Sequence, residues 1–274
     1  MNGPLPERHR PRRRFGQNFL RDRAVVERIV AAIAPRPGQR LVEIGPGEGA
    51  LTGPLLAAAG RLEAIELDRD LVARLRQRYP AGSGLALHAG DALTFDFRAL
   101  AADTRLRLVG NLPYNISTPL LFHLFDQLDA VADMHFMLQK EVVDRLAAAP
   151  GGKSYGRLSL MAQLHCRITP LLQVPPGAFR PPPKVDSTVV RLVPHPQPPV
   201  ALHDPARFRL LVTAAFAQRR KTLRNSLRDH LDAAAMAAAG VDPGRRPETL
   251  TLAEFAGLAN LPAATACAGP GKGL

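Results

Sequence analysis

The sequence has little of what a metal centre, a disulfide framework or a membrane anchor requires. Among 274 residues only Cys166 and Cys267 are cysteines, and they lie far apart with no CxxC spacing. We therefore expect neither a zinc site nor disulfides, and the protein fits a reducing cytoplasm. No window approaches 18 uninterrupted apolar residues, so we expect no transmembrane helix. The arginines near the N-terminus precede no apolar stretch, which argues against a secretory signal.

Acidic residues are also scarce relative to basic ones, and the excess is unevenly placed. The chain has 36 Lys and Arg against 24 Asp and Glu, a net charge of +12. Residues 1–14, 141–200 and 201–274 each carry a net charge of +4, whereas residues 15–140 are balanced. A polyanion that docks on the charged periphery and inserts one unit into the neutral region suits this distribution. The alternative is a coding bias toward Arg, which supplies 31 of the basic residues.

Short apolar runs alternate along the chain with segments of helical periodicity. We expect strands over 41–44, 62–66, 85–89, 106–109 and 134–138, and helices over 24–34, 49–59, 70–79, 117–128 and 140–148. Residues 157–174 and 187–193 are interpreted as a further helix and a further strand. This alternation predicts an α/β fold with a doubly wound, mostly parallel, Rossmann-like sheet.

A proline-rich stretch at 194–199 indicates a linker, after which the pattern becomes wholly helical. Asp204 and Pro205 have the order of an N-cap and a first helical residue, and Thr251 with Glu254 fits a capping box. We expect a basic mobile tail over 1–14, an α/β domain over 15–198 and a small helical domain over 199–274. The last residues, 263–274, are expected to be mobile as well.

A glycine loop follows the first strand of the expected sheet. Gly45 and Gly47 allow a tight turn and a close approach of ligand to backbone. Gly45-x-Gly47-x-x-Ala50, with Glu66 21 residues after Gly45, also fits the dinucleotide fingerprint. A carboxylate at Glu66 accepts hydrogen bonds from both ribose hydroxyls, so this pair of features suits either NAD or S-adenosylmethionine (SAM).

Residues farther along the chain separate the two cofactors. Asp91 follows the third strand, where its carboxylate could accept from the adenine amine of a cofactor. A dehydrogenase would need a proton-shuttling group, but His88, His123 and His135 lie in or beside apolar elements and are interpreted as structural. Asp68 and Asp70 are better placed to complement a helix N-terminus.

The tetrapeptide Asn111-Leu112-Pro113-Tyr114 can hold a flat base. The Asn111 side-chain carbonyl and the Leu112 backbone carbonyl would accept the two hydrogens of an exocyclic amine, while Pro113 fixes the turn. Tyr114 offers a ring on which the base can stack. Phe179, in a stiff proline-rich segment, could cover the opposite face of the base, or that segment could be a plain rigid linker. Together with the glycine loop, these residues point to methyl transfer from SAM to an adenine amine.

Five segments in order then resemble a known family. They are Phe15–Leu20 (FGQNFL), Glu43–Gly47 (EIGPG), Asn111–Ser117 (NLPYNIS), Phe179–Ser187 (FxPxPxVxS) and Ala217–Asn225 (AQRRKTLRN). From about residue 12 to 260 the chain resembles the bacterial 16S rRNA adenine N6-dimethyltransferases. The resemblance implies dimethylation of two adjacent adenosines in a hairpin loop near the 3′ end of 16S rRNA, during small-subunit assembly. The SAM contacts that it implies are Asn18, Leu20, Gly45, Glu66, Asp91 and Asn111, to which the glycine loop adds Gly47.

The C-terminal helices supply the expected RNA-binding residues. These are Arg219, Arg220, Lys221, Arg224 and Arg228. Arg220, Arg224 and Arg228 recur every four residues, so a helix would place them on one face, with Leu223, Leu227 and Leu231 on another. The alternative is a basic face that contacts only solvent.

We expect a cytoplasmic monomer that acts on 16S rRNA in the small subunit or its precursor. Two other functions remain open. One is the related 23S rRNA methylase that confers macrolide resistance, and the other is a non-catalytic assembly or transcription factor on the same fold. Such a factor could lose Asp91 or Asn111, and both are present here.

Overall fold

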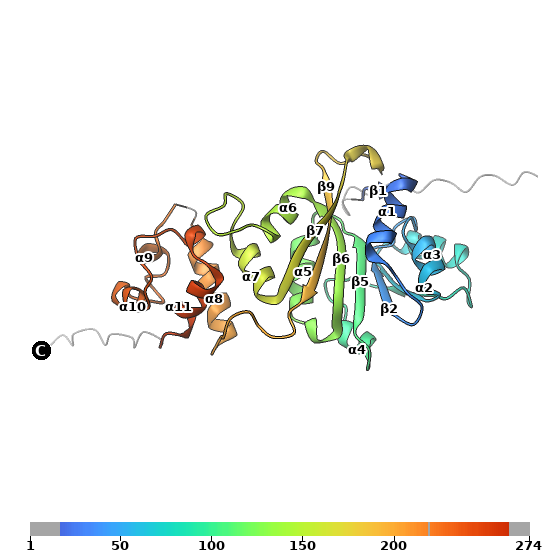
Figure 1. The fold of residues 1–274 in the computed structure, drawn as a ribbon. Coiled ribbons are helices and arrows are strands. Elements are labelled where there is room, and N and C mark those ends of the chain that lie inside the picture. The colour runs from blue at the N-terminus through green and yellow to red at the C-terminus, as the bar shows by residue number, and fades with distance from the viewer. Residues whose placement is uncertain (1–16, 219, 263–274) are drawn as a thin grey trace, which may run out of the picture. The chain divides into compact units, whose positions relative to one another are not determined.

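The computed structural model describes residues 17–218 and 220–262, so both expected tails and Arg219 lie outside the described residues. The chain divides into two compact units (Figure 1). The described part of the first contains residues 17–143 and 167–194, and the second contains 144–166 and the residues from 195 onward. This division differs from the expected uninterrupted domain over 15–198. The reason is that α7 (Arg157–His165) buries Leu160 and Met161 and packs on two C-terminal helices, α8 and α11.

The first unit contains a seven-stranded sheet with the strand order β4-β3-β2-β5-β6-β9-β7. Its strands are β2 (Arg40–Ile44), β3 (Leu62–Glu66), β4 (Leu85–Ala89), β5 (Leu106–Asn111), β6 (Val131–Gln139), β7 (Cys166–Val174) and β9 (Ser187–Pro194). The strands from β2 to β6 pair in parallel, and β9 pairs antiparallel to β6. The expected α/β fold with a mostly parallel sheet is confirmed. Two short strands, β1 (Phe19–Leu20) and β8 (Phe179–Arg180), form a separate antiparallel pair.

Four helices connect the parallel strands: α2 (Thr52–Ala59), α3 (Arg69–Arg78), α4 (Phe97–Ala101) and α5 (Ser117–Phe125). Helix α1 (Arg23–Ile33) precedes β2, and α6 (Lys140–Leu146) follows β6. The Asp22 side chain caps α1 by accepting from the Val25 N–H, and Val25, Ile29 and Ile33 form the buried face of this helix. Asp68 caps α3 by accepting from the Asp70 N–H, which confirms its expected place at a helix N-terminus.

The expected helix over 157–174 is wrong in its second half, because α7 ends at His165 and residues 166–174 form strand β7. Pro170 lies in this segment, and a proline in a helix interior removes a hydrogen bond and clashes with the preceding turn. Strand β7 is the last in the sheet order, and an edge strand tolerates a residue that lacks the N–H.

The order of the sheet reverses at β2, which lies between β3 and β5. In parallel α/β sheets, such a reversal leaves a crevice at the carboxyl ends of the two diverging strands, where ligands bind. Gly110 lets β5 lie close to β2 just below this crevice, since an added Cβ atom would lie 2.5 Å from the Ile44 carbonyl oxygen. The fold thus brings the residues after Ile44 and Asn111 to one place.

The three histidines among the described residues of this unit occupy structural positions. His88 Nε2 lies 2.7 Å from a Glu63 carboxylate oxygen, and His123 Nε2 lies 2.8 Å from the Phe95 carbonyl oxygen. His135 is almost fully buried, and this burial lowers its pKa to about 4. None of the three lines the pocket described below.

The second unit is helical in its C-terminal part, as expected. Its helices beyond α7 are α8 (Pro205–Phe216), α9 (Leu223–Ser226), α10 (Ala233–Ala238) and α11 (Leu252–Asn260). Asp204 caps α8 with Pro205 as its first residue, and Thr251 and Glu254 form the expected capping box on α11. Across the described residues, no helix has the length and apolar content that a membrane span requires.

Candidate active site

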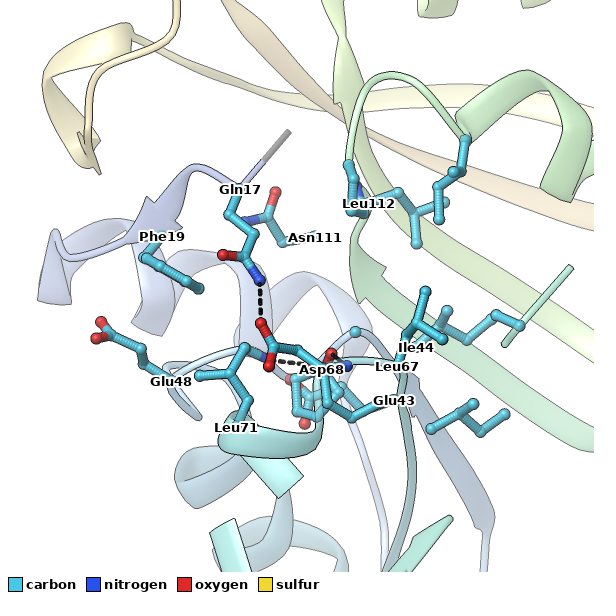
Figure 2. Close-up of a pocket in the computed structure, with 18 of the residues that line it drawn as sticks. Gln17, Phe19, Glu43, Ile44, Glu48, Leu67, Asp68, Leu71, Asn111 and Leu112 are labelled. Carbon is cyan, nitrogen blue, oxygen red and sulfur yellow. Dashed lines mark hydrogen bonds between the residues drawn. The ribbon is translucent and has the colours of Figure 1, made fainter. Parts of the chain in front are cut away.

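A pocket opens at the reversal point of the sheet, at the carboxyl ends of β2, β3, β4 and β5. It encloses about 1090 Å³, counting the part that is open to solvent. Figure 2 shows Glu43 and Ile44 of β2 on one side of it and Asn111 and Leu112 on another, with Gln17 reaching in from the N-terminal segment. Every cofactor residue expected from the sequence lines this pocket: Asn18, Leu20, Gly45, Gly47, Glu66, Asp91 and Asn111.

The glycine loop after β2 turns in a conformation that favours glycine. Gly45, Gly47 and Gly49 have φ angles of 66°, 58° and 80°. Glu66, at the end of β3, holds the loop because its Oε2 accepts from the Gly47 N–H at 3.1 Å while its Oε1 accepts from the Asp68 N–H at 2.9 Å. Burial raises the pKa of Glu66, and these two hydrogen bonds oppose that rise. Glu66, the residue expected to bind the ribose, is therefore hydrogen-bonded to the glycine loop itself.

Glu43 is a second buried carboxyl group at this end of the sheet. It is 2% exposed, and its Oε2 accepts from the Thr52 hydroxyl at 2.6 Å. Burial raises its pKa to about 7; the hydrogen bond from Thr52 lowers it, and the nearby Glu66 raises it further. Sequence reasoning assigned Glu43 no role, although it lies directly before the glycine loop on β2.

The Asn111 side chain has a fixed orientation. Its Nδ2 donates to the Asn18 carbonyl oxygen at 3.0 Å, and only the nitrogen of an amide can make that bond. The side-chain oxygen, Oδ1, therefore points away from Asn18 and has no hydrogen-bond partner among the described residues. This is the acceptor that the sequence expectation requires.

In the turn after Asn111, the Pro113 carbonyl is hydrogen-bonded within the protein, whereas the Leu112 carbonyl is not. The Pro113 carbonyl accepts from the Ile116 N–H and from the Ser117 hydroxyl, which fixes the turn into α5. The Leu112 N–H donates to Met137 of β6. The Leu112 carbonyl accepts from no donor within residues 17–218 and 220–262.

Tyr114 is half-buried at the mouth of the pocket, and its ring is held from another strand. Its hydroxyl lies 2.8 Å from the Ser187 hydroxyl at the start of β9. Burial raises the pKa of Tyr114, and the hydrogen bond with Ser187 opposes that rise. This contact joins the tetrapeptide to the last residue of the Phe179–Ser187 segment.

Asp91 lies at the end of β4 in a local turn, where its Oδ1 accepts from the Leu93 N–H at 2.9 Å. The second oxygen, Oδ2, has no hydrogen-bond partner among the described residues. Leu67, between Glu66 and Asp68, is 50% exposed although it is a large apolar side chain in the pocket wall. Both residues line the pocket, where Leu67 offers an apolar surface and Asp91 Oδ2 offers a hydrogen-bond acceptor to a purine.

The N-terminal segment crosses the pocket in a way that sequence spacing did not reveal. The Gln17 amide donates to Asp68 Oδ2 at 3.3 Å, as Figure 2 shows, and Arg21 forms an ion pair with Glu48 of the glycine loop. The Phe19 ring lies against Gly47, where an added Cβ would be 3.2 Å from it. Pairing of β1 with β8 holds this segment in place.

The charge of the pocket wall has one sign. Five acidic side chains line it: Glu43, Glu48, Glu66, Asp68 and Asp91. Among the described residues, no Lys, Arg or His is part of the wall. Such a site attracts a cation and repels an anion such as a pyrophosphate.

Phe179 does not line this pocket. It is 5% exposed and belongs to the core cluster that also contains Leu20, Met137 and Val189. The ring is buried in the core, and Phe179 pairs with Leu20 where β8 meets β1. The expectation that Phe179 covers a bound base therefore differs from this structure.

The basic residues of the second unit also differ from the sequence expectation. Arg220, Lys221, Arg224 and Arg228 are exposed, and Arg219 lies outside the described residues. They do not share one helix, because α9 spans only Leu223–Ser226. The Leu223 and Arg224 N–H groups donate to the Arg245 and Pro243 carbonyls instead of to a preceding helical turn.

The leucine face of this segment is confirmed, since Leu223, Leu227 and Leu231 are 0%, 0% and 2% exposed. Arg224 thus lies in α9 and Arg220 and Arg228 on the turns that flank it, in a segment whose leucines are buried. The four-residue spacing correctly predicted that the leucines are buried, but the prediction of one continuous helix through this segment was wrong.

Comparison with known proteins agrees with this site. A family model described as ribosomal RNA adenine dimethylase matches residues 8–263. The chain is 58% identical over 266 residues to ribosomal RNA small subunit methyltransferase A of Chromohalobacter salexigens, covering 95% of this chain and 94% of that protein. It is 61% identical over 251 residues to the protein of the same name from Methylococcus capsulatus, covering 92% and 97%.

Solved structures share the fold. A dimethyladenosine transferase from Plasmodium falciparum is 28% identical with a TM-score of 0.66, over 81% of this chain and 78% of that one. The 23S rRNA methyltransferase ErmE, 24% identical with a TM-score of 0.69 over 88% and 98%, shows likeness of fold alone. The family match spans both structural units, and with the two curated relatives it establishes that this chain belongs to the ribosomal RNA adenine dimethylase family.

Proposed function

We propose that this chain dimethylates the N6 amines of two adjacent adenosines in a hairpin loop near the 3′ end of 16S rRNA, with SAM as methyl donor. The observation that carries the proposal is the fixed Asn111 amide. Its Nδ2 is held by the Asn18 carbonyl, so its Oδ1 is presented to the pocket as an acceptor. An acceptor in that place selects an exocyclic amine over a carbonyl.

SAM fits the chemistry of the wall. It carries a sulfonium and an ammonium, and the five carboxyl groups of the wall favour cations. Asp91 Oδ2 and the exposed Leu67 would bind its adenine, and Glu66 its ribose. The glycine loop would let its amino-acid end approach bare backbone. NAD fits less well, because the carboxylates of the described wall would repel its pyrophosphate.

The Leu112 carbonyl would supply the second acceptor, since the Pro113 carbonyl is already used by the turn. Two acceptors on the two amino hydrogens orient the nitrogen lone pair and favour the tetrahedral nitrogen of the transition state. Tyr114 would stack on the base, an interaction worth roughly 1–3 kcal/mol. SAM supplies an activated methyl group, so these residues need only bind and orient the amine, whose proton leaves to water.

The helical part of the second unit would bind the rRNA backbone through its exposed cations. We propose Arg219, Arg220, Lys221, Arg224 and Arg228 for this role, with the chain acting as a monomer on the small subunit or its precursor. Subunit assembly places that reaction in the cytoplasm. Phe179 would act indirectly, by keeping β8 and thereby β1 in place.

The test is incubation of the full chain with SAM tritiated on the methyl group and small subunits that lack the modification. We expect label on two adjacent adenosines of 16S rRNA, as N6,N6-dimethyladenosine in nuclease digests. Large subunits serve as the matched substrate control. Label in 23S rRNA would assign the chain to the resistance-type reaction, and SAM binding or rRNA binding without label would assign it to a non-catalytic factor.

A further inference from the structure

Ser187 is a buried polar residue that the proposed methyl transfer does not use directly. It is 0% exposed, and its hydroxyl lies 2.8 Å from the Tyr114 hydroxyl. Its backbone is fixed, because Ser187 opposes Gln139 in the pairing of β9 with β6. One residue earlier, the Asp186 carbonyl accepts from the Lys140 N–H. A rigid strand thus reaches the outer end of the Tyr114 ring.

The inner end of that ring is fixed by a different part of the chain. Tyr114 follows Pro113 in the turn whose carbonyls cap α5, so its Cα position is set by β5 and α5. The hydroxyl lies on the long axis of the ring, so a hydrogen bond there fixes the first side-chain torsion and with it the direction in which the ring extends. The position of the ring is therefore defined by two separate strands, β5 at its root and β9 at its hydroxyl.

We propose that Ser187 is a positioning residue, which holds the Tyr114 ring in the orientation that stacks the target adenine beside the Asn111 acceptor. This inference rests on the proposed function, because it takes Tyr114 as the stacking surface. Ser187 does not contact the base. Its effect falls on the rate of methyl transfer, since a ring that can swing away from this position presents the amine in the attacking orientation for a smaller fraction of the time.

The plain alternative is that the two hydroxyls only satisfy each other in a buried place. The neighbouring residue offers a matched control for that reading. Thr188 is also on β9 and 5% exposed, and its hydroxyl has no hydrogen-bond partner among the described residues. Thr188→Val removes a buried hydroxyl from the same strand with little change in shape and without touching Tyr114.

The kinetic test uses Ser187→Ala, Tyr114→Phe, the double variant and Thr188→Val on small subunits with SAM. We expect Ser187→Ala and Tyr114→Phe each to lower kcat about five- to tenfold, the loss typical of one hydrogen bond. SAM affinity should stay within about twofold. The double variant should be no slower than either single one, because both remove the same bond. Thr188→Val should keep the wild-type kcat.

An unchanged kcat in Ser187→Ala, or losses that multiply in the double variant, would overturn the proposal. If Ser187→Ala does not fold, as judged by its unfolding temperature, Ser187→Cys with Tyr114→Phe completes the same cycle with a weaker donor. A loss in SAM affinity equal to the loss in kcat would also count against it, since it would place Ser187 in cofactor binding.

A spectroscopic readout separates this inference from the proposed function. The chain has no Trp and three Tyr residues, so Tyr79→Phe with Tyr155→Phe leaves Tyr114 as the sole emitting side chain. In that background Ser187→Ala should lower the steady-state anisotropy of Tyr114 and raise the pKa of its phenol, whereas Thr188→Val should change neither. If these shifts occur but the wild type forms no methylated product, the proposed function is wrong although Ser187 does hold the Tyr114 ring. If the wild type methylates rRNA but Ser187→Ala causes no shift, the proposed function stands and the positioning role of Ser187 is wrong.

Discussion

Asn111 shows how one side chain can be prepared for a reaction by a residue far away in the sequence. The Asn18 carbonyl takes the amide nitrogen and thereby fixes where the oxygen points. The sequence predicted Asn111 and its acceptor role from the tetrapeptide alone. It did not predict the bond to Asn18, because nothing in local spacing reports a contact across 93 residues.

Replacing Asn111 by Ala removes the acceptor for the reacting amine. We expect kcat for small subunits to fall about 100-fold or more, the usual loss when a donor or acceptor of the transition state is removed. RNA affinity should stay within about twofold, because most of it comes from phosphate contacts. Asn111→Asp is the informative companion: it keeps an acceptor but places a carboxylate against the Asn18 carbonyl, so its rate should also fall. A wild-type rate in Asn111→Ala would remove this residue from the reaction.

Asp91 carries a prediction about cofactor affinity. Its Oδ1 is used by the Leu93 N–H, which leaves Oδ2 for the adenine amine of SAM. Asp91→Ala should weaken SAM binding by about 1–3 kcal/mol, the cost of one buried hydrogen bond, with little change in rRNA affinity. Titration calorimetry measures this, with the exposed Asp103→Asn as the control of equal charge loss. An unchanged dissociation constant would place the adenine elsewhere in the pocket.

Glu43 makes the stability of the protein depend on pH. Its pKa is about 7 in the folded chain against 4.5 in the unfolded reference, so between these values the folded chain holds a proton that the unfolded chain has lost. The contribution of Glu43 to the free energy of unfolding therefore falls as pH rises from about 4.5 to 7, by on the order of 3 kcal/mol. His135, whose pKa is lowered to about 4 in the folded chain, contributes an opposite rise between about 4 and 6.5. The effect of Glu43 is therefore measured as a difference: in denaturant titrations at pH 5 and pH 8, wild type should lose stability relative to Glu43→Gln, whereas the exposed Glu27→Gln should follow the wild type.

At the scale of elements, the site depends on how closely β5 lies against β2. An alanine Cβ at Gly110 would lie 2.5 Å from the Ile44 carbonyl oxygen, a backbone atom that cannot turn aside. Gly110→Ala should lower the free energy of unfolding by about 1–3 kcal/mol and reduce methyl transfer by displacing Asn111. Gly177→Ala, where an added Cβ meets nothing within 4 Å, should change stability by under about 0.5 kcal/mol. Equal thermal midpoints in the two variants would refute the argument.

Elements with a strong period were predictable, and those set by long-range pairing were not. The strands over 62–66 and 85–89 match their predicted ranges, because each is an apolar run bounded by a turn. Strand β7 was taken for helix because its edge position, which tolerates Pro170, is a property of the sheet and not of the segment. The two-residue strands β1 and β8 exist only through each other, so no local signal marks them.

The same limit explains the misplaced parts of the site and of the domain boundary. Phe179 lies in a stiff segment, as expected, but whether its ring faces the pocket or the core is decided by the residues that pack around it. The proline-rich stretch at 194–199 does end the sheet, since β9 stops at Pro194. It does not mark the whole boundary, because residues 144–166 cluster with the C-terminal helices.

At the scale of the whole molecule, the pocket wall is acidic whereas the excess of basic residues lies in other segments of the chain. The pocket wall contains five acidic side chains, whereas residues 141–200 and 201–274 each carry a net charge of +4. A cationic cofactor and a polyanionic substrate are thus attracted to different parts of one chain. This arrangement lets rRNA affinity be altered without altering SAM affinity.

The salt dependence of rRNA binding tests that separation. Arg220, Arg224 and Arg228 are exposed on α9 and the turns that flank it, in a segment whose leucines are buried. If each contacts a phosphate, the triple Ala variant should lower the slope of log affinity against log salt by about 0.7–0.9 per lost contact, with unchanged SAM affinity. Removing the exposed Arg69, Arg74 and Arg76 of α3 takes away the same charge from the first unit and should leave the slope nearly unchanged. Equal losses in both variants would mean that the RNA responds to total charge, and a wild-type slope in the first would move the RNA site away from α9.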